Sequence, residues 1–301
     1  MIVYYKNNEI DREQWDNCVK NSPGVKPYGF SWYLDIMSPG WQALVDDDYD
    51  SVFPVPGFSR FGIQYVSTPP FLQQLGAFSP DKPASKAIKE FLDFMPDMYR
   101  HIDLCVAQKI KIKGYKVTEK TNLELDLSRS YEKISNHFSP QCKKNIKVSA
   151  KKQPEILTDI SPDEMIDLYI RDNLKKIRGF KIREYQRLKI LMNFCLKNKK
   201  GRILGVRTTR KRLIFAIFLI ETPGNKTLRF VVSTPESVIK RIGYFVINDL
   251  IKNYSNTRTI LDFAGSSIQS IDPLEESFGC VNVPYYRVYR NRLFWPVRLM
   301  K

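Results

Sequence analysis

The sequence predicts an α/β (α+β) protein of two domains, each with a mixed, mostly antiparallel sheet flanked by helices. The chain has 301 residues, which is long for one domain and comfortable for two of about 150 residues each. Hydrophobic residues make up 43% of it, enough for a packed core in both halves. Both halves also show helical patterns first, then strands, a long helix and a last strand. We place the boundary between residues 148 and 149, so the predicted domains are 1–148 and 149–301.

The first half reads as short strands that alternate with helices. Asp11 is the expected N-cap of the first helix, because its carboxylate can accept hydrogen bonds from the free N–H groups of a first turn. Leucines alternate with acidic residues near the end of the 115–127 stretch, which is the period of a half-buried strand. Strands are expected at about 2–5, 41–45, 51–56, 62–66, 102–107 and 115–127, and helices at about 11–19 and 83–95.

The second half repeats this order with clearer helix starts. Ser130, Ser139 and Ser161 are expected caps, and a proline follows each of the last two at the first helical position. Pro223 and Gly224 predict the turn of a hairpin. Helices are expected at about 140–152, 161–176, 183–197 and 238–253, and strands at about 201–208, 212–221, 227–233, 259–263 and 283–289.

The net charge of +16 is concentrated in one block. Residues 131–212 carry 22 basic and 8 acidic residues, a net +14, whereas residues 1–130 carry a net −2. A localised positive field attracts anions and raises their encounter rate. The block is therefore either a solvated basic surface or the binding surface of a phosphate-bearing partner, such as a nucleotide-containing cofactor, RNA or an anionic substrate.

Cysteine and histidine usage excludes several classes of site. The five cysteines are scattered without a CxxC pair, and there are two histidines, so we expect no metal site and no serine or cysteine triad. Free thiols are typical of a reducing cytoplasm. The N-terminus lacks the pattern of a signal peptide, and the longest apolar run, Leu213–Ile220, is far shorter than the roughly 20 residues of a membrane span. We expect a cytoplasmic protein with no membrane span.

One stretch of the second half suits a phosphate. A predicted strand ends at Ser233, and Lys240, Arg241 and Gly243 follow at the start of the next helix. Backbone N–H groups at a helix start bind phosphate, and the helix dipole adds to the attraction. A lysine–arginine pair on a helix start is otherwise an ordinary solvated feature.

This stretch resembles the GNAT superfamily of acyl-CoA N-acyltransferases, whose pyrophosphate loop reads (Arg/Gln)-x-x-Gly-x-(Gly/Ala). Lys240, Gly243 and Phe245 stand at the three defined positions, so only the glycine matches. The whole chain is similar to the FemAB-like branch, in which two GNAT-like domains occur in tandem. The resemblance covers nearly the full length and is carried by SWYLD (Ser31–Asp35), PPFLQQLGAFS (Pro69–Ser79), SPQCKKNIKVSAKK (Ser139–Lys152) and LDFAGSSI…FGC (Leu261–Cys280).

The resemblance implies an N-acyltransferase that moves an acyl group from a phosphate-bearing donor to an amine. Acyl-CoA is the preferred donor, as a co-substrate rather than a tightly bound cofactor, and a small molecule or a peptide carries the acceptor amine. Fem-type ligases instead use aminoacyl-tRNA and a peptidoglycan precursor, which is the second interpretation. A third is a non-catalytic RNA- or anion-binding module on a degenerate transferase fold.

Site residues follow from this resemblance. In the second domain, backbone N–H groups at Val231, Val232 and Ser233 would stabilise the oxyanion. Asp262, at the end of a strand, would hold or deprotonate the amine, or else it is a structural acid that bonds the amides of the turn after it. That turn, with Gly265 and Ser266, would contact the substrate.

The remaining candidates are two possible proton carriers and one acceptor site. Glu275 stands where relatives place a tyrosine or a lysine, so it is either a base or a helix-surface residue. Tyr286, on the final strand, is a candidate general acid. The acceptor-site candidates in the first domain are Trp32, Tyr33, Gln73 and Gln74, because rings stack on substrates and amides hydrogen-bond them; for Trp32 and Tyr33 ordinary core packing is the alternative.

Overall fold

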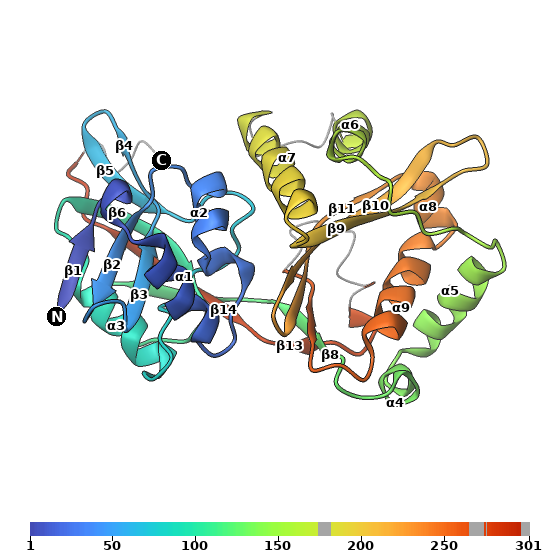
Figure 1. Cartoon of the computed structure of the whole chain (residues 1–301), viewed down its shortest axis with the longest axis horizontal. Coiled ribbons are helices and arrows are strands. Elements are labelled where there is room, and N and C mark those ends of the chain that lie inside the picture. Colours follow the sequence, from blue (N-terminus) through green and yellow to red (C-terminus); the bar gives the residue numbers. More distant parts are fainter. Residues whose placement is uncertain (174–181, 265–273, 275, 296–301) are drawn as a thin grey trace. The chain divides into compact units, whose positions relative to one another are not determined.

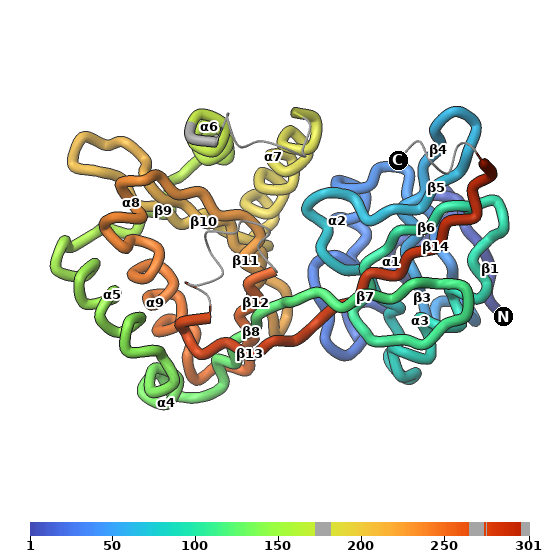
Figure 2. The backbone as a smooth tube through the Cα atoms, turned by 180° about the vertical axis from the view of Figure 1, so that it is seen from behind, coloured from blue at the N-terminus to red at the C-terminus, as the bar shows by residue number. Residues whose placement is uncertain are grey.

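The computed structural model describes residues 1–173, 182–264, 274 and 276–295, and Figure 1 labels its helices and strands. The chain forms two compact units. Unit 1 comprises Met1–Thr121 and Pro284–Lys301, and unit 2 comprises Asn122–Val283. Figure 2 lets the reader follow the chain as it leaves unit 1 after β7 and returns to it before β14. The division differs from the predicted one between residues 148 and 149, which lies inside helix α5 (Pro140–Ala150).

Unit 1 contains two sheets that a short segment joins. One has the order β1-β2-β3 and the other β4-β5-β6-β14-β7. Single bridges pair Leu75 with Val106 of β6 and Phe78 with Val52 of β3, so residues 75–78 connect the sheets. The strands are β1 (Ile2–Tyr5), β2 (Gln42–Asp46), β3 (Ser51–Val55), β4 (Gly57–Arg60), β5 (Ile63–Ser67), β6 (Tyr99–Val106), β7 (Lys116–Lys120) and β14 (Tyr285–Asn291).

Aromatic side chains form much of the core of unit 1. The rings of Trp15 and Trp41 lie 4.6 Å apart and are fully buried. Asp11 caps α1 as predicted, since its carboxylate accepts from the N–H groups of Glu13 and Gln14. The helices are α1 (Arg12–Asn21), α2 (Ser31–Met37) and α3 (Ala84–Phe94), with short 3-10 turns at Asn7–Glu9 and Pro27–Gly29.

Unit 2 is built on one mixed sheet of order β13-β8-β12-β11-β10-β9. Strands β9, β10 and β11 are antiparallel, β11 and β12 are parallel, and β8 runs antiparallel to β12. The strands are β8 (Leu123–Asp126), β9 (Gly201–Arg207), β10 (Leu213–Thr222), β11 (Asn225–Ser233), β12 (Ile260–Asp262) and β13 (Val281–Asn282).

Helices cover both faces of this sheet (Figure 1). On one face, α5 and α9 pack on a core that includes Leu125, Leu261 and Val246. On the other, the ring of Tyr169 on α6 packs at a tilt against that of Phe230 on β11, with ring centroids 5.0 Å apart. The caps Ser130, Ser139 and Ser161 accept first-turn N–H groups as predicted. The helices are α4 (Tyr131–Asn136), α5, α6 (Pro162–Asn173), α7 (Ile182–Lys197), α8 (Pro235–Ile239) and α9 (Ile242–Tyr254).

Three features of the fold differ from the sequence prediction. The expected helix at 238–253 is two helices, because Arg241 adopts a left-handed conformation (φ 58°) between α8 and α9. The stretch 115–127 is two strands, β7 in unit 1 and β8 in unit 2. The final strand, β14, lies between β6 and β7 in unit 1, not in the second domain. Alternation identifies a strand, but it does not identify the strands beside it.

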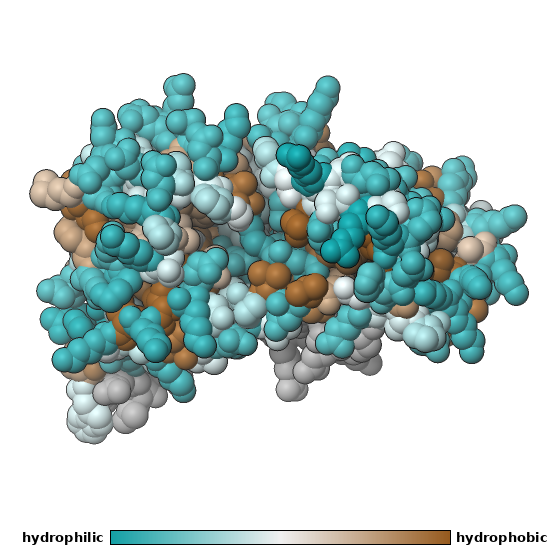
Figure 3. All heavy atoms as spheres, turned by 90° about the horizontal axis from the view of Figure 1, so that it is seen from below, coloured by the Kyte–Doolittle hydropathy of each residue, from teal (hydrophilic) through white to brown (hydrophobic). Residues whose placement is uncertain are grey.

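The described residues include no helix long and apolar enough to cross a bilayer. They also include no group of three or more His, Cys, Asp or Glu side chains arranged to hold a metal ion. Figure 3 views one face of the molecule, where hydrophilic side chains predominate and hydrophobic ones gather in small separate groups.

Candidate functional site

The parallel pairing of β11 with β12 is short because β12 ends at Asp262, and it leaves part of one edge of β11, here called the open edge, without a described strand partner. Three residue pairs join the two strands, the last of them Thr227 with Asp262. Strand β11 then continues for six more residues, to Ser233, and no strand in the described part of the chain pairs with it on that side. The pairing stops at the carboxyl end of β12, and the part of β11 without this partner is its carboxyl-terminal part; ligands in sheets with parallel strands bind beyond the carboxyl ends of the strands.

The backbone of Val231 and Ser233 faces this open edge. The Thr234 N–H donates to the carbonyl of Ile214 across from it (3.0 Å), and hydrogen-bonded pairs alternate along an antiparallel ladder. Val232, opposite Ala216, is therefore in the next hydrogen-bonded pair, and its N–H faces β10. The N–H groups of Val231 and Ser233 point the other way, towards the space that β12 leaves.

A β-bulge lies just before these residues. Phe218 pairs with Phe230 and Leu219 with Leu228, so Arg229 is an extra residue on β11. A bulge bends the strand and increases its local twist, and bulges occur often beside active sites. The bulge therefore bends β11 just beyond Thr227, the last residue that pairs with β12.

Helix α9 begins after the carboxyl end of β11, as the phosphate-binding hypothesis requires. Arg241 is its N-cap, is exposed, and makes no side-chain capping hydrogen bond. The first N–H groups of this 13-residue helix can thus serve an anion. Gly243 lies in the first turn, and a Cβ there would be 3.0 Å from Leu274 Cδ1 and 3.4 Å from Phe215 Cε2. The glycine lets the helix pack closely on β10.

Lys240 makes an ion pair with a neighbouring carboxylate. Its ammonium pairs with Glu236 of α8 at 2.6 Å, and Arg212 pairs with the same carboxylate. The hydrogen bond from Lys240, together with the two positive charges, holds the pKa of Glu236 below its usual range. Of the two predicted cations, Lys240 and Arg241, Arg241 is therefore the one that makes no ion pair with a described carboxylate.

Asp262 is fully buried at the end of β12. Its Oδ1 accepts hydrogen bonds from the backbone N–H of Ala264 (2.8 Å) and from Asn122 Nδ2 (3.1 Å). Ala264 has φ 55°, so the carboxylate supports a left-handed turn directly after the strand. This geometry favours the structural alternative for Asp262, and the catalytic role stays a prediction.

Sequence reasoning missed Glu124 and Asn122, which accompany Asp262. Glu124 is half-buried on β8 and is the register partner of Asp262. The Asn122 amide donates to both carboxylates, at 3.1 Å each. Leu123 and Leu125 belong to the core under α5 and α9, so Glu124 projects from the opposite face of the sheet. The alternation of leucines and acidic residues indicated that Glu124 lies on a strand. No local pattern of residues shows which distant strand lies beside it.

The acceptor-site candidates come together in unit 1. The Tyr33 hydroxyl donates to the carbonyl of Phe71, and the Tyr28 hydroxyl lies 3.5 Å from Gln73 Oε1. The Gln74 amide donates to the same Gln73 oxygen (3.3 Å). Trp32 is half-buried, and its ring lies 5.7 Å from that of Tyr33. Tyr33, Gln73 and Gln74 are buried, so Trp32 is the member of the set with an accessible ring.

The other predicted residues are distributed differently. Tyr286 lies on β14 of unit 1, paired with Val106 and Glu119, whereas Asp262 belongs to unit 2. Desolvation, then the charge and hydrogen bond of Glu119, raise the pKa of Tyr286, which keeps the phenol protonated. Glu275, Gly265 and Ser266 lie outside the described residues.

Four of the thiols are unsuited to nucleophilic chemistry. Burial raises the pKa of Cys18 to about 11 and that of Cys195 to about 12, and it also raises the pKa of Cys105 and Cys142. The thiolate is the reactive form, and these groups are thiols near neutral pH. These four thiols are therefore poor nucleophiles near neutral pH.

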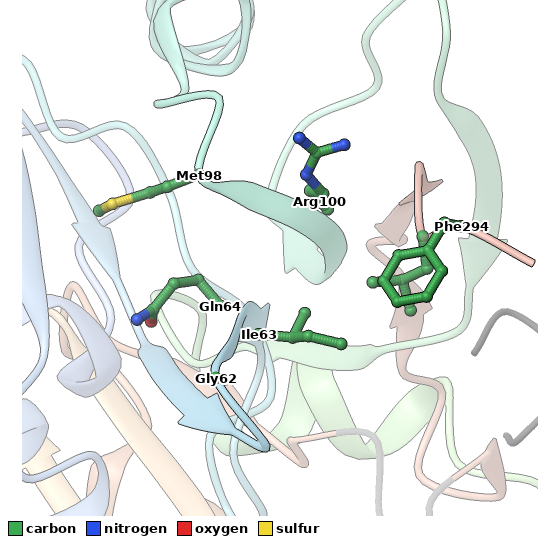
Figure 4. Close-up of a pocket in the computed structure, with 7 residues that line it drawn as sticks. Gly62, Ile63, Gln64, Met98, Arg100 and Phe294 are labelled. Carbon is green, nitrogen blue, oxygen red and sulfur yellow. The ribbon is translucent and has the colours of Figure 1, made fainter.

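Unit 1 also has an open depression of about 430 Å³ near the β4–β5 turn. In Figure 4 the Ile63 side chain and the Phe294 ring lie on one side of it, and Met98 and Gln64 point towards the other. Arg100 is its one charged lining residue. The depression contains none of the predicted site residues and offers no acid–base pair.

Solved structures share this fold over almost the whole chain. FemX aligns with a TM-score of 0.68 at 10% identity, covering 98% of this chain and 99% of FemX. A conserved protein of unknown function from Bacteroides thetaiotaomicron VPI-5482 aligns with a TM-score of 0.62 at 10% identity, covering 96% and 99%. L-PGS from Bacillus licheniformis aligns with a TM-score of 0.56 at 12% identity, covering 96% and 95%.

The chain has the tandem GNAT-like fold of FemX. This confirms the predicted fold class and the structural side of the resemblance. No family model and no curated protein matches the sequence. At these identities the likeness establishes the fold alone, so the chemistry has to be argued from the residues of this chain.

Proposed function

We propose that this protein is an N-acyltransferase that moves an acyl group from a phosphate-bearing donor to an amine. The open edge of β11 carries this proposal. Two backbone N–H groups, of Val231 and Ser233, point away from β10, on the side of β11 that has no described strand partner beyond Thr227. Fixed N–H donors of this kind stabilise the negative charge that develops on a carbonyl oxygen during acyl transfer.

The remaining groups of unit 2 complete the reaction. The amine nitrogen attacks the acyl carbonyl carbon, the new C–N bond forms, and the C–S bond of a thioester breaks. Glu124 accepts the proton that the attacking ammonium must lose, because it is the half-buried carboxylate beside the strand end. The nitrogen loses its second proton as the C–S bond breaks, and this proton passes through water to the departing thiolate, which leaves as the thiol. Asn122 orients both carboxylates, and Asp262 shapes the turn.

Acyl-CoA is the donor we prefer. The start of α9, with Arg241 free of a capping role, is suited to a pyrophosphate. Trp32 and its neighbours in unit 1 would then bind the acceptor. All five cysteines lie in the described part of the chain and form no disulfide, which supports a reducing, cytoplasmic setting for the reaction.

Helix α5 supports aminoacyl-tRNA as a second candidate donor. Its face and C-terminal end carry five exposed lysines that make no ion pair with a described carboxylate: Lys143, Lys144, Lys147, Lys151 and Lys152. A donor such as acyl-CoA, with three phosphate groups, needs only a small cationic pocket. A long row of unpaired cations is typical of a surface that binds a nucleic acid backbone.

A thermal-shift titration tests the proposal and separates the two donors. The protein is titrated with acetyl-CoA, a longer acyl-CoA, free CoA and tRNA, at low and at high salt. A ligand at about 100 times its Kd adds roughly 2.7 kcal/mol of stability. A saturable rise with an acyl-CoA that persists in high salt supports our donor. A rise with tRNA alone, lost in high salt, selects the second, and no response to any of them overturns the proposal.

A further inference from the structure

The β9–β10 turn and helix α8 form one surface of unit 2, here called the turn–helix surface (residues 208–212 and 235–241). The Arg212 guanidinium in the turn makes an ion pair with Glu236 on α8. The Thr234 N–H, at the cap of α8, donates to the Ile214 carbonyl directly after the turn (3.0 Å). These contacts hold the two segments beside each other, and both lie at the same end of the sheet (Figure 1).

Two neighbouring aliphatic side chains project from this surface into solvent. Val238 is 52% exposed and Ile239 is 76% exposed. The helix that carries them is held in place, because Thr234 caps it and buried Ser237 returns a hydrogen bond to the Thr234 carbonyl (2.8 Å). Adjacent exposed aliphatics on a well-anchored helix are a feature of interaction sites.

Cations surround these aliphatic side chains. The surface carries Arg210, Lys211, Arg212, Lys240 and Arg241, and Glu236 is its one acidic residue. Glu236 pairs with Arg212 and Lys240. Arg210, Lys211 and Arg241 are exposed and make no ion pair with a described residue. The surface is therefore positive, with three cations available to an external anion.

We propose that the turn–helix surface docks on a lipid bilayer that contains anionic lipids. Val238 and Ile239 enter the boundary between head groups and acyl chains, and the cations bind lipid phosphates. Charge complementarity identifies an anionic partner, and the exposed aliphatics identify one with an apolar interior. Single-stranded nucleic acid is bound on aromatic rings, and the described residues of this surface carry none. The proposal does not rest on acyl transfer.

Co-sedimentation with vesicles tests this docking. The full chain is mixed with vesicles of phosphatidylglycerol and phosphatidylcholine, or of phosphatidylcholine alone, at low and at high salt. We expect binding to the anionic vesicles that weakens in high salt. The double variant Val238→Gln, Ile239→Gln should bind on the order of tenfold more weakly, because the apolar side chains no longer enter the bilayer. The variant Arg210→Gln, Lys211→Asn should lose about tenfold as well.

Controls keep the test specific to this surface. Ile190 on α7 is 56% exposed, so Ile190→Gln removes an exposed aliphatic elsewhere in unit 2 and should leave vesicle binding unchanged. Each variant should keep its melting temperature, since all the substituted side chains are exposed. Equal binding by the Val238–Ile239 variant, equal binding to neutral vesicles, or binding of a short RNA without binding of vesicles would each overturn the proposal.

Discussion

The two units contain the same structural element and use it differently. In unit 1, β5 and β6 are parallel and joined by α3; in unit 2, β11 and β12 are parallel and joined by α8 and α9. Beyond the β5–β6 pairing, the chain returns to the edge of β6, where the Leu75 N–H donates to the Cys105 carbonyl (2.7 Å) and Ala107 donates to Leu75 (2.9 Å). Unit 1 thus closes its strand pair with its own backbone.

Unit 2 leaves the corresponding place without a described strand partner. The six residues of β11 after Thr227 have none on the β12 side. The difference shows that two similar strand pairs can be completed differently. In unit 1 a neighbouring backbone segment extends the pair, whereas in unit 2 two backbone N–H groups lie on a side with no described strand partner, as the proposed oxyanion role requires.

The largest effect should come from prolines placed on the two sides of β11. Val232→Pro removes an N–H that faces β10, so we expect the melting temperature to fall by at least about 10 °C. Ser233→Pro removes an N–H that faces the open edge, so the fold should persist while transfer falls on the order of 100-fold. Thermal unfolding measures the stability of the two variants. Release of the thiol from the acyl-CoA selected by titration measures their rate of acyl transfer. Equal destabilisation by the two prolines would contradict the assigned strand orientation.

Phe78→Ala tests the packing of the segment 75–78, which joins the two sheets of unit 1. The buried Phe78 ring fills the space beside Gly29, where a Cβ would lie 2.2 Å from Phe78 Cζ. Emptying this space should cost about 3–5 kcal/mol of unfolding free energy, measured by urea denaturation. Phe61→Ala is the matched control, because Phe61 is exposed and its loss should be nearly neutral. Donor binding in unit 2 should be the same in both variants, and loss of it in Phe78→Ala would show that the units are not independent.

Glu124→Gln examines the proposed base, which pairs in register with the last residue of β12. The Gln side chain keeps an oxygen for the Asn122 amide but cannot take a proton, so transfer should fall about 100-fold with little change in stability. Asp126→Asn is the control on the same strand, where the carboxylate caps the Ser128 N–H and is exposed. If the two variants retain equal activity, Glu124 is not the base.

The smallest effect concerns acid stability in unit 2. Desolvation raises the pKa of Glu221, but ion pairs with Arg202 (2.5 Å) and Lys226 (3.0 Å) outweigh it and bring the pKa below the ordinary 4.5. A depressed folded-state pKa adds stability above the unfolded pKa, and this is lost as pH falls through the folded value. Glu221→Gln should therefore lower stability by about 1 kcal/mol near neutral pH, and this difference from the wild type should disappear as the pH falls through the folded-state pKa of Glu221.

The matched control for this experiment lies in unit 1. Glu13 on α1 is exposed, and no ion pair with a described residue holds it, so Glu13→Gln should leave the acid limb of the stability curve unchanged. Melting temperatures of both variants are measured from pH 3 to 8, a range that covers the ordinary carboxylate pKa values. They show whether only Glu221→Gln changes the dependence of stability on pH. A parallel shift of the Glu221→Gln curve at every pH would contradict the sign of its pKa change.

Much of the local structure could be predicted from the sequence. The caps Asp11, Ser130, Ser139 and Ser161 are confirmed, because a cap needs only the residues of its own first turn. The hairpin at Pro223 and Gly224 is also confirmed, with Thr222 opposite Asn225. The helix α2 and the strand β4 were missed, since both are short and neither shows a sustained period.

The sequence by itself determined the element types, the fold class and the positive block at 131–212, because these depend on neighbours in the chain or on composition. The tertiary structure decided which strands lie side by side. It placed β14 and Tyr286 in unit 1, brought Glu124 to Asp262, and gave β11 no described strand partner on the β12 side beyond Thr227. The physical reason is register: pairing between distant segments depends on the packing of whole sheets, and no local pattern of residues encodes it.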